Sequence, residues 1–344
     1  MSALAVLWFF LIFVLIAGYF VLDGFDLGAG VLYPFIAKNE QEQALVRRAI
    51  GPVWDGNEVW LLTAGGALFA AFPDAYATTF SGFYLAVMLV LFGLIVRAVS
   101  FEFWAADKKW RGVWNVCFFV GSLLPALLLG VAVGNVVAGI PMDAAGNYIG
   151  VPLLGLITPF TLLCGVLGLV MFLAAGASWI ALKAPLDSPV RDRAVKLRFP
   201  LRVIAIVVFL CVSFLANQQI LPYTGITLYV PAVIFAVLFI VALAFAIYFA
   251  REKGSDLLSF LCQSAGALCL VGVLACSMFP NLVVASADSI GPNITLMSAG
   301  ASELSLTCMT VILCIGLPLV LIYHVVIYRT FRGRVDYSEL AHAE

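Results

Sequence analysis

Three polar side chains interrupt the beginning of an apolar stretch that runs from Gly51 to Phe72. They are Asp55, Asn57 and Glu58, and a membrane-spanning helix is expected to continue from them through the apolar residues that follow. Ionisable side chains in a spanning segment are costly in lipid and persist where they serve a function. Carboxyl groups can pass protons to neighbouring groups and water, so Asp55 and Glu58 are predicted to form a proton path.

A second acidic pair and one arginine fall within other apolar stretches. Asp23 and Asp26 are three residues apart and therefore share one helix face. Arg97 lies inside a predicted span and is followed five residues later by Glu102. Because a buried guanidinium needs a carboxylate partner, we expect these four residues to form a buried charge cluster. Two roles stay open for Asp23 and Asp26, which are static pairing with Arg97 and participation in proton transfer.

The histidine content argues against a haem or metal centre within this chain. The sequence has two histidines, His324 late in the last apolar stretch and His342 near the C-terminus. A haem held by two histidines needs both of them inside the membrane. We therefore predict no metal site and interpret His324 as an interfacial side chain with satisfied hydrogen bonds. Nucleotide-binding, zinc and nucleophile motifs are also absent from the sequence, so the chain alone is not expected to be a complete enzyme.

The composition places these groups in a polytopic membrane protein. Of the 344 residues, 64% are hydrophobic and 11% are charged, and the mean hydropathy is +1.12. These values lie outside the range of soluble domains, and the net charge of −1 does not indicate a nucleic-acid partner. A span needs about 20 apolar residues. We expect an all-α bundle of nine transmembrane helices, at approximately 5–27, 53–72, 78–100, 113–136, 154–182, 201–220, 226–250, 257–279 and 304–328.

The distribution of basic residues orients this bundle. All Lys and Arg residues other than Arg97 fall at or near alternate connections and in the C-terminal segment. The remaining connections contain neither residue type; these are 73–77, 137–153, 221–225 and 280–303. By the positive-inside rule, we predict a single transmembrane domain over 1–344 with a periplasmic N-terminus and a cytoplasmic tail at 329–344. This orientation places both acidic pairs and the arginine near the inner surface of the membrane.

Several long blocks of the sequence match a known family. The most specific are VLDGFDLGAGVLYPF and GPVWDGNEVWLLTAGGALFAAFP. FSGFYLAVMLVLFGLIVRAVSFEFW and GSLLPALLLGVAVGN extend the likeness through about the first 140 residues. SMFPNLVVAS and LTCMTVILCIGLPLVLIYH continue it more loosely near the C-terminus. Together these blocks resemble subunit II of the cytochrome bd-type quinol oxidases.

The resemblance implies a terminal respiratory oxidase of the bacterial inner membrane, which oxidises membrane quinol and reduces oxygen to water. In that family the larger subunit I carries haems b558, b595 and d, or haem b in place of d, together with the quinol site. Subunit II is a nine-helix partner that stabilises haem assembly and contributes to proton and oxygen access, and the complex is electrogenic without being a proton pump. The family allows a small single-helix accessory subunit and a structural quinone or lipid. The short connection after the sixth span resembles the shorter subunits, including those of the cyanide-insensitive branch.

The resemblance also assigns individual residues. Asp55 matches the position associated with the cytoplasmic proton entrance, and Asp26 and Arg97 match buried charged positions near the interface with the haem-bearing subunit. Glu58 stands where some members carry glutamine.

Without the resemblance, two other classes of protein would also account for these residues. A proton-coupled secondary transporter also uses acidic pairs within spans, and a purely structural subunit would have all its buried charges in interface pairs.

Overall fold

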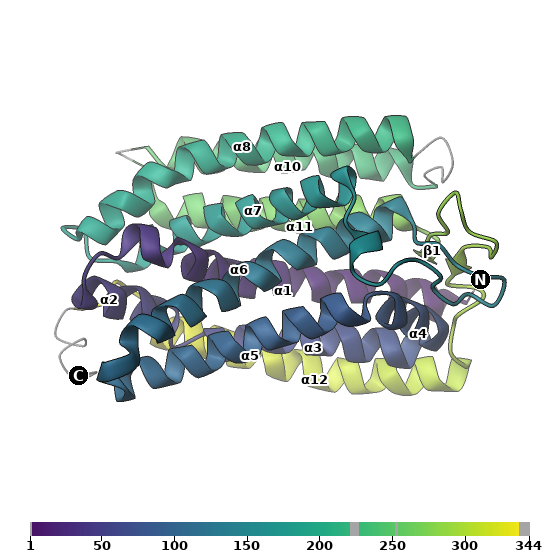
Figure 1. The fold of residues 1–344 in the computed structure, drawn as a ribbon, viewed down its shortest axis with the longest axis horizontal. Helices are drawn as coiled ribbons and strands as arrows, with labels where there is room; N and C mark the ends of the chain where they lie inside the picture. The colour runs from purple at the N-terminus through teal and green to yellow at the C-terminus, as the bar shows by residue number, and fades with distance from the viewer. Residues whose placement is uncertain (1, 221–226, 252–253, 337–344) are drawn as a thin grey trace.

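The computed structural model describes residues 2–220, 227–251 and 254–336, and nearly all of their secondary structure is helical. The long helices run side by side along one axis of the molecule (Figure 1). The elements are α1 (Ala3–Ile36), α2 (Glu40–Ile50), α3 (Trp54–Ala71), α4 (Pro73–Gly82), α5 (Tyr84–Ala106), η1 (Lys108–Trp110), α6 (Arg111–Ala138), η2 (Leu154–Leu156), α7 (Pro159–Lys183), α8 (Pro189–Gln219), α10 (Tyr229–Phe249), α11 (Asp256–Met278), β1 (Asn281–Val283), β2 (Ile294–Thr295) and α12 (Glu303–Thr330).

Eight of the described helices are long and apolar enough to cross a membrane, which makes the chain a multi-pass membrane protein. They correspond to eight of the nine predicted spans. The predicted span at 53–72 forms α3, which is not among the eight because polar residues occupy its first turns. The predicted boundaries of the span at 78–100 are wrong. The chain breaks after Gly82, at Phe83, into the short α4 and the long α5, where glycine is a weak helix former.

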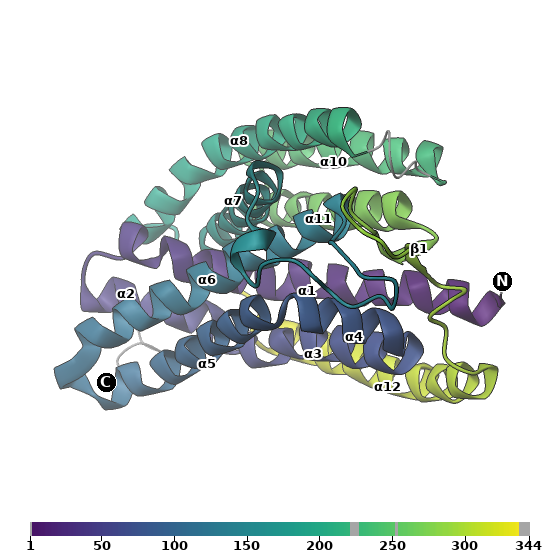
Figure 2. The same ribbon diagram turned by 45° about the vertical axis from the view of Figure 1, so that its right-hand side comes forward.

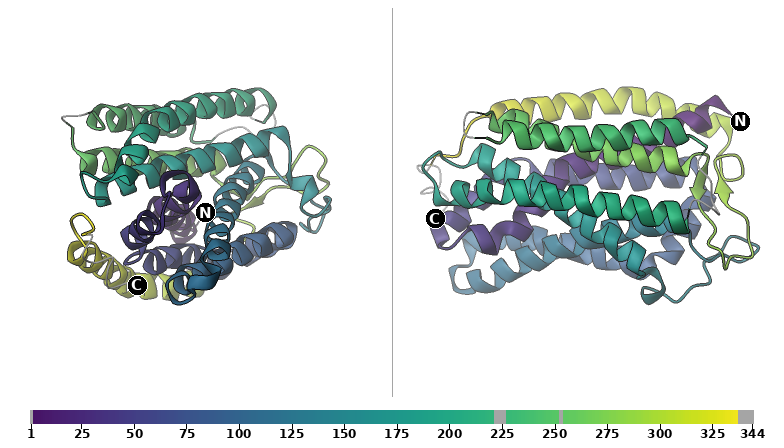
Figure 3. Two further views of the ribbon diagram at one scale, coloured as in Figure 1. Left: turned by 60° about the vertical axis from the view of Figure 1, so that its left-hand side comes forward. Right: turned by 90° about the horizontal axis from the view of Figure 1, so that it is seen from above.

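Helix α1 lies at the centre of the bundle and extends further than predicted. Figure 3 (left) shows it surrounded by the other helices, with α8 and α10 on one side and α12 on the other. It continues to Ile36 because apolar residues follow its acidic pair without a break. At 1.5 Å per residue, Asp23 and Asp26 lie about 15 to 20 Å from the end of the helix. The acidic pair is therefore deeper in the bundle than the sequence suggested.

Close contact with α7 fixes the rotation of α1. A Cβ atom at Gly28 would lie 1.8 Å from the carbonyl oxygen of Phe172, and a Cβ atom at Gly176 would lie 2.4 Å from the backbone nitrogen of Ala29. Only glycine permits such an approach between two helix backbones. The crossing turns one face of α1 toward α7 and leaves the face with the acidic residues toward α3 and α5.

Helix α2 returns the chain from the end of α1 to the start of α3. Its N-cap is Asn39, whose side chain accepts a hydrogen bond of 2.9 Å from the backbone N–H of Glu42. Its apolar face, including Ile50, is buried, and the indole of Trp179 in α7 donates to the carbonyl oxygen of Ala49 at 2.9 Å. Helix α2 therefore packs against α7 and leads the chain to the start of α3.

The two ends of the bundle differ. The end that holds the N-terminus also carries the connection between α6 and α7 and the β1–β2 ribbon (Figure 1), and Figure 2 shows α8 and α10 as a separate layer over α7 and α11. At the other end, Arg334 donates to Asp256 at 3.0 Å. The described part of the predicted tail at 329–344 thus packs against the helices. Residues 337–344, with His342, lie outside the described residues.

Candidate functional site: a buried charge cluster

Arg97 of α5 forms ion pairs with carboxylates from two other helices. Its Nη1 atom lies 2.7 Å from Oε1 of Glu58 in α3 and 3.1 Å from Oδ1 of Asp23 in α1. The side chains of Arg97 and Asp23 are 2% and 0% exposed, whereas that of Glu58 is 22% exposed. Three helices therefore meet at one guanidinium, and Glu58, predicted as part of a separate proton path, belongs to this Arg97 cluster.

Packing against α6 explains the direction of the Arg97 side chain. A Cβ atom at Gly121 of α6 would lie 2.7 Å from the backbone nitrogen of Arg97, so the α6 backbone occupies that side of α5. The side chain extends to the opposite side, toward Asp23 and Glu58. The ring of Trp54 lies beside it, with the ring centroid 5.9 Å from Cζ of Arg97, a distance at which the guanidinium is attracted to the aromatic face.

Asp26 is buried next to this ion pair, but its side-chain partner is neutral. Nδ2 of Asn57 donates to Oδ2 of Asp26 at 2.7 Å, and the hydroxyl of Tyr328 in α12 donates to Oδ1 of Asn57 at 3.1 Å. Asp26 and Asn57 are both 0% exposed. These hydrogen bonds link α1, α3 and α12 beside the Arg97 cluster. Of the two acids predicted on α1, Asp23 pairs with Arg97 and Asp26 pairs with Asn57.

Two predicted site residues lie outside the buried cluster. The side chain of Glu102 is exposed, so the prediction that it joins the buried charges is wrong. It lies five positions after Arg97, which rotates it by about 140° around the helix, away from α1 and α3. Asp55 is also exposed, and it lies one turn before Glu58 at the start of α3. Asp55 and the partly exposed Glu58 therefore lead from the surface of α3 to the buried Arg97.

Four polar atoms in this region are buried and have no hydrogen-bond partner among the residues that the structure describes. They are the Tyr19 hydroxyl, Oδ2 of Asp23, Oδ1 of Asp26 and Nη2 of Arg97. Buried polar groups are almost always hydrogen-bonded to protein or to ordered water. Spare hydrogen-bonding capacity is therefore concentrated around the Arg97 cluster.

His324 of α12 has both ring nitrogens occupied. Nε1 of Trp60 donates to Nε2 of His324 at 3.2 Å, and Nδ1 of His324 lies 2.9 Å from the carbonyl oxygen of Val320. Since a carbonyl oxygen only accepts, this pattern places the ring proton on Nδ1. Neither nitrogen is then available to a haem iron. The described ranges contain no second histidine that could complete a haem site held by two histidines.

Sequence reasoning missed a second buried arginine. It assigned Arg202 to the edge of an inner connection, whereas the structure buries its side chain completely within α8. Its guanidinium donates to neutral oxygens of four residues: Oε1 of Gln263 at 3.1 Å, the carbonyl of Ala246 at 2.7 Å, the hydroxyl of Ser178 at 2.8 Å, and the hydroxyl and carbonyl of Ser259 at 2.9 and 3.5 Å. The one signal in the sequence that Arg202 is buried is the apolar run that follows this residue directly.

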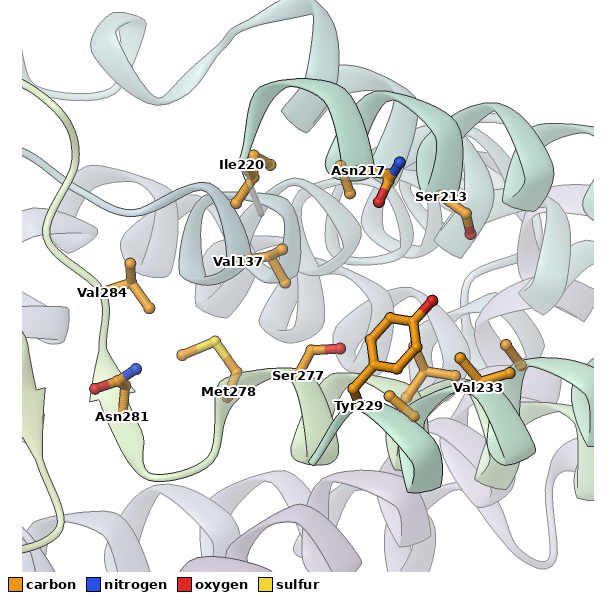
Figure 4. A pocket seen from close by; sticks show the side chains of 14 residues that line it. Val137, Ser213, Asn217, Ile220, Tyr229, Val233, Ser277, Met278, Asn281 and Val284 are labelled. Carbon is orange, nitrogen blue, oxygen red and sulfur yellow. The ribbon is translucent and has the colours of Figure 1, made fainter. Parts of the chain in front are cut away.

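A cavity of about 220 Å³ lies between the ends of α8, α10 and α11 (Figure 4). Most of its lining is apolar, and its polar side chains are Ser213, Asn217, Tyr229, Ser277 and Asn281. It lacks the carboxylates and basic groups that proton transfer uses. The Arg97 cluster is therefore the candidate functional site.

Comparisons with known proteins agree on one family. Residues 4–331 match the family described as cytochrome bd terminal oxidase subunit II. The chain is 36% identical to the cytochrome bd ubiquinol oxidase subunit 2 of Bacillus subtilis, over 98% of this chain and 99% of that protein. It is 31% identical to the cytochrome bd-I ubiquinol oxidase subunit 2 of Escherichia coli K12, over 98% and 97%. The solved structure of the bd oxidase from Geobacillus thermodenitrificans contains a chain of the same fold, with a TM-score of 0.81 and 15% identity over 96% of this chain and 99% of that one.

These matches cover nearly the whole chain, including every residue of the Arg97 cluster. The relatives are named as oxidase subunits, so they favour the oxidase interpretation over a secondary transporter. The chain belongs to the cytochrome bd terminal oxidase subunit II family.

Proposed function

We propose that this chain is the subunit II of a complex that oxidises quinol and reduces oxygen to water, and that it guides cytoplasmic protons toward the haem-bearing subunit I. Its relatives in Bacillus subtilis and Escherichia coli are named as subunits of ubiquinol oxidases. The proton role depends on one observation, the buried ion pairs of Arg97 with Asp23 and Glu58 behind the exposed Asp55. In this proposal Asp55 receives the proton and Glu58 passes it inward.

The charge balance of the cluster supports this role. Asp23, Asp26 and Glu58 supply three carboxyl groups, and Arg97 supplies one positive charge. A net negative charge is costly in a low-dielectric interior, so we infer that at least one of these carboxyl groups holds a proton at rest. A protonated carboxyl group beside an ionised one is the arrangement that a proton relay uses.

The position of Asp55 supports a protein partner at α3. Leu62 of α3 is 69% exposed and Ile322 of the adjacent α12 is 60% exposed, which are faces suited to lipid or to another apolar surface. A carboxylate near such a face is costly against lipid. A partner subunit can supply it with a polar partner or a water-filled path. We therefore place subunit I against α3, with the proton entrance at the boundary between the two subunits.

The haems of the complex belong to subunit I in this proposal. The occupied ring nitrogens of His324 support that assignment, and the family resemblance supports haems b558, b595 and d, or b in place of d, together with the quinol site on that partner. This chain stabilises haem assembly through its contact with subunit I. Because oxygen reduction consumes cytoplasmic protons and quinol oxidation releases protons outside, the complex separates charge without pumping.

The proposal also includes nine transmembrane helices in the bacterial inner membrane, with a periplasmic N-terminus and a cytoplasmic C-terminus. The count of nine is supported by the eight apolar helices and by α3, which lies alongside them (Figure 1). The basic residues at one end support the orientation. A small single-helix accessory subunit and a structural quinone or lipid are compatible with this arrangement.

Replacing Asp55 with asparagine tests the proton entrance. Asparagine keeps the shape of the side chain but cannot carry a proton, so quinol-dependent oxygen uptake should fall at least about tenfold. The visible spectra of the assembled haems should stay unchanged. Asp187, an exposed aspartate in the connection between α7 and α8, provides the matched control Asp187→Asn. Equal turnover of the two variants would exclude proton uptake at Asp55.

A further inference from the structure

Tyr19 of α1 is a buried polar residue that the proposed path does not use. Its side chain is 0% exposed, and its ring packs in an apolar cluster with Trp60 and Phe172. Its hydroxyl lies beside the carboxyl group of Asp23, but it makes no hydrogen bond of full geometry within the part of the chain that the structure describes. Buried tyrosine hydroxyls usually have a hydrogen-bond partner, so this hydroxyl needs an explanation.

The spacing along α1 places Tyr19 on the same face as the two acids. Tyr19, Asp23 and Asp26 follow the pattern i, i+4, i+7, which aligns side chains along one helix stripe. Tyr19 lies about 6 Å farther from the inner end of the bundle than Asp23. Asp23 in turn contacts Arg97 at 3.1 Å through one oxygen only.

The unpartnered atoms of this stripe are chemically complementary. Oδ2 of Asp23 and Oδ1 of Asp26 are acceptors, Nη2 of Arg97 is a donor, and the Tyr19 hydroxyl can do both. An anion does not fit beside two acids, and a metal cation does not fit beside a guanidinium. Water fits, because it donates and accepts and commonly makes about three hydrogen bonds to buried polar groups.

We propose that Tyr19, Asp23, Asp26 and Arg97 bind internal water, and that Tyr19 is a positioning residue that holds this water beyond Asp23, toward the middle of the membrane. This site deepens the proposed function, because it extends the polar path within this chain by one helical turn past the ion pairs. The role of this site in proton transfer rests on the proposed function, whereas the binding of water is independent of it.

Radiolytic footprinting of the purified complex in ¹⁸O-labelled water tests the water site directly. X-rays convert bound water into hydroxyl radicals, which oxidise the nearest side chains even when these are shielded from bulk solvent. Tyr33 of α1 is the internal control, because it is 1% exposed and its hydroxyl is occupied by Asn115 at 2.6 Å and Arg47 at 3.3 Å. We expect severalfold more label at Tyr19 than at Tyr33. Equal labelling of the two would overturn the proposal.

The variant Tyr19→Phe provides a second test that is expected to leave the fold intact, because the lost hydroxyl gives up only its contact with the Asp23 carboxyl group. Loss of one hydrogen bond to the water should lower its occupancy, and the label at position 19, roughly fivefold. Label unchanged from wild type would overturn the role of Tyr19. Strong labelling of Tyr19 combined with normal turnover of Asp55→Asn would leave the water site standing and end the proposed proton entrance.

Discussion

The two most deeply buried arginines of the described chain are held in opposite ways. Arg97 is 1% exposed and Arg202 is 0% exposed. Arg97 contacts two carboxylates through Nη1 alone, and its Nη2 has no partner in the described ranges. Arg202 uses Nε, Nη1 and Nη2 to donate to neutral oxygens of α7, α10 and α11. The first site depends on the charge of the side chain and the second on its shape.

This difference shows that burial alone does not identify a functional charge. A guanidinium whose donors are all matched to fixed neutral acceptors ties helices together and has no capacity left for another ligand. A guanidinium with surplus carboxyl groups and unpartnered atoms around it can accommodate protons and water. By this criterion the proposed function belongs to the half of the bundle with Arg97, and we interpret the half with Arg202 as scaffold.

Removing the charge of Arg97 should have the largest effect on stability. Arg97→Gln leaves Asp23 buried without a cation, which costs about 3 to 5 kcal/mol. Arg97→Lys keeps the charge and should retain most of the stability, because only Nη1 contacts the acids. Thermal unfolding of the purified complex measures both. Adding Asp23→Asn to Arg97→Gln should recover part of the loss, and an additive double variant would contradict the ion-pair interpretation.

We expect that lysine cannot replace Arg202 without a loss of stability, because this site depends on the shape of the guanidinium. Arg202→Lys keeps the charge but cannot reach four separate acceptors, and interhelical hydrogen bonds in membranes contribute about 0.6 kcal/mol each on average. We expect a loss of about 1 to 2 kcal/mol, close to that of Arg202→Gln, in the same thermal unfolding assay. If Arg202→Lys were as stable as wild type while Arg97→Lys unfolded, the two sites would have to be reassigned.

Glu58→Gln should separate activity from stability. Glutamine can still accept the hydrogen bond from Arg97, and the side chain of Glu58 is partly exposed, so the stability loss should stay below about 1 kcal/mol. Oxygen uptake should fall about three- to tenfold if Glu58 relays protons. Ser259→Ala at the Arg202 site is the matched control, which should lower stability by a similar amount and leave oxygen uptake unchanged.

The apolar runs predicted most of the fold, because a membrane span is a local signal. The common depth of Asp23, Glu58 and Arg97 also followed from the sequence, since consecutive spans alternate in direction. Partner choice did not follow, because helix rotation decides it. That rotation depends on contacts distant in sequence, such as Gly28 against α7 and Gly121 behind Arg97.

Arg202 could not be assigned from the sequence for a similar reason. The helix that carries it begins at Pro189, well before the apolar run that defined the predicted span. Its acceptors are two serines, a glutamine and a backbone carbonyl, residue types that carry no signal for a buried charge. The sequence identified the site with surplus carboxylates because charge is scarce in membranes, and it missed the site built from neutral groups.

The variant with the smallest expected effect, Tyr328→Phe, tests whether Asn57 and Asp26 belong to the proposed proton path. Tyr328→Phe removes one hydrogen bond to Asn57 and leaves Asn57 bound to Asp26, so it should cost about 0.6 kcal/mol and change oxygen uptake less than twofold. Ser178→Ala removes one hydrogen bond at the Arg202 site and should cost about the same. If Tyr328→Phe lowers oxygen uptake about tenfold at equal stability, the Asn57 side chain and Asp26 belong to the proton path. If both variants behave alike, the Asn57 side chain lies outside the proton path, and the hydrogen bonds of α12 only hold α3 in place.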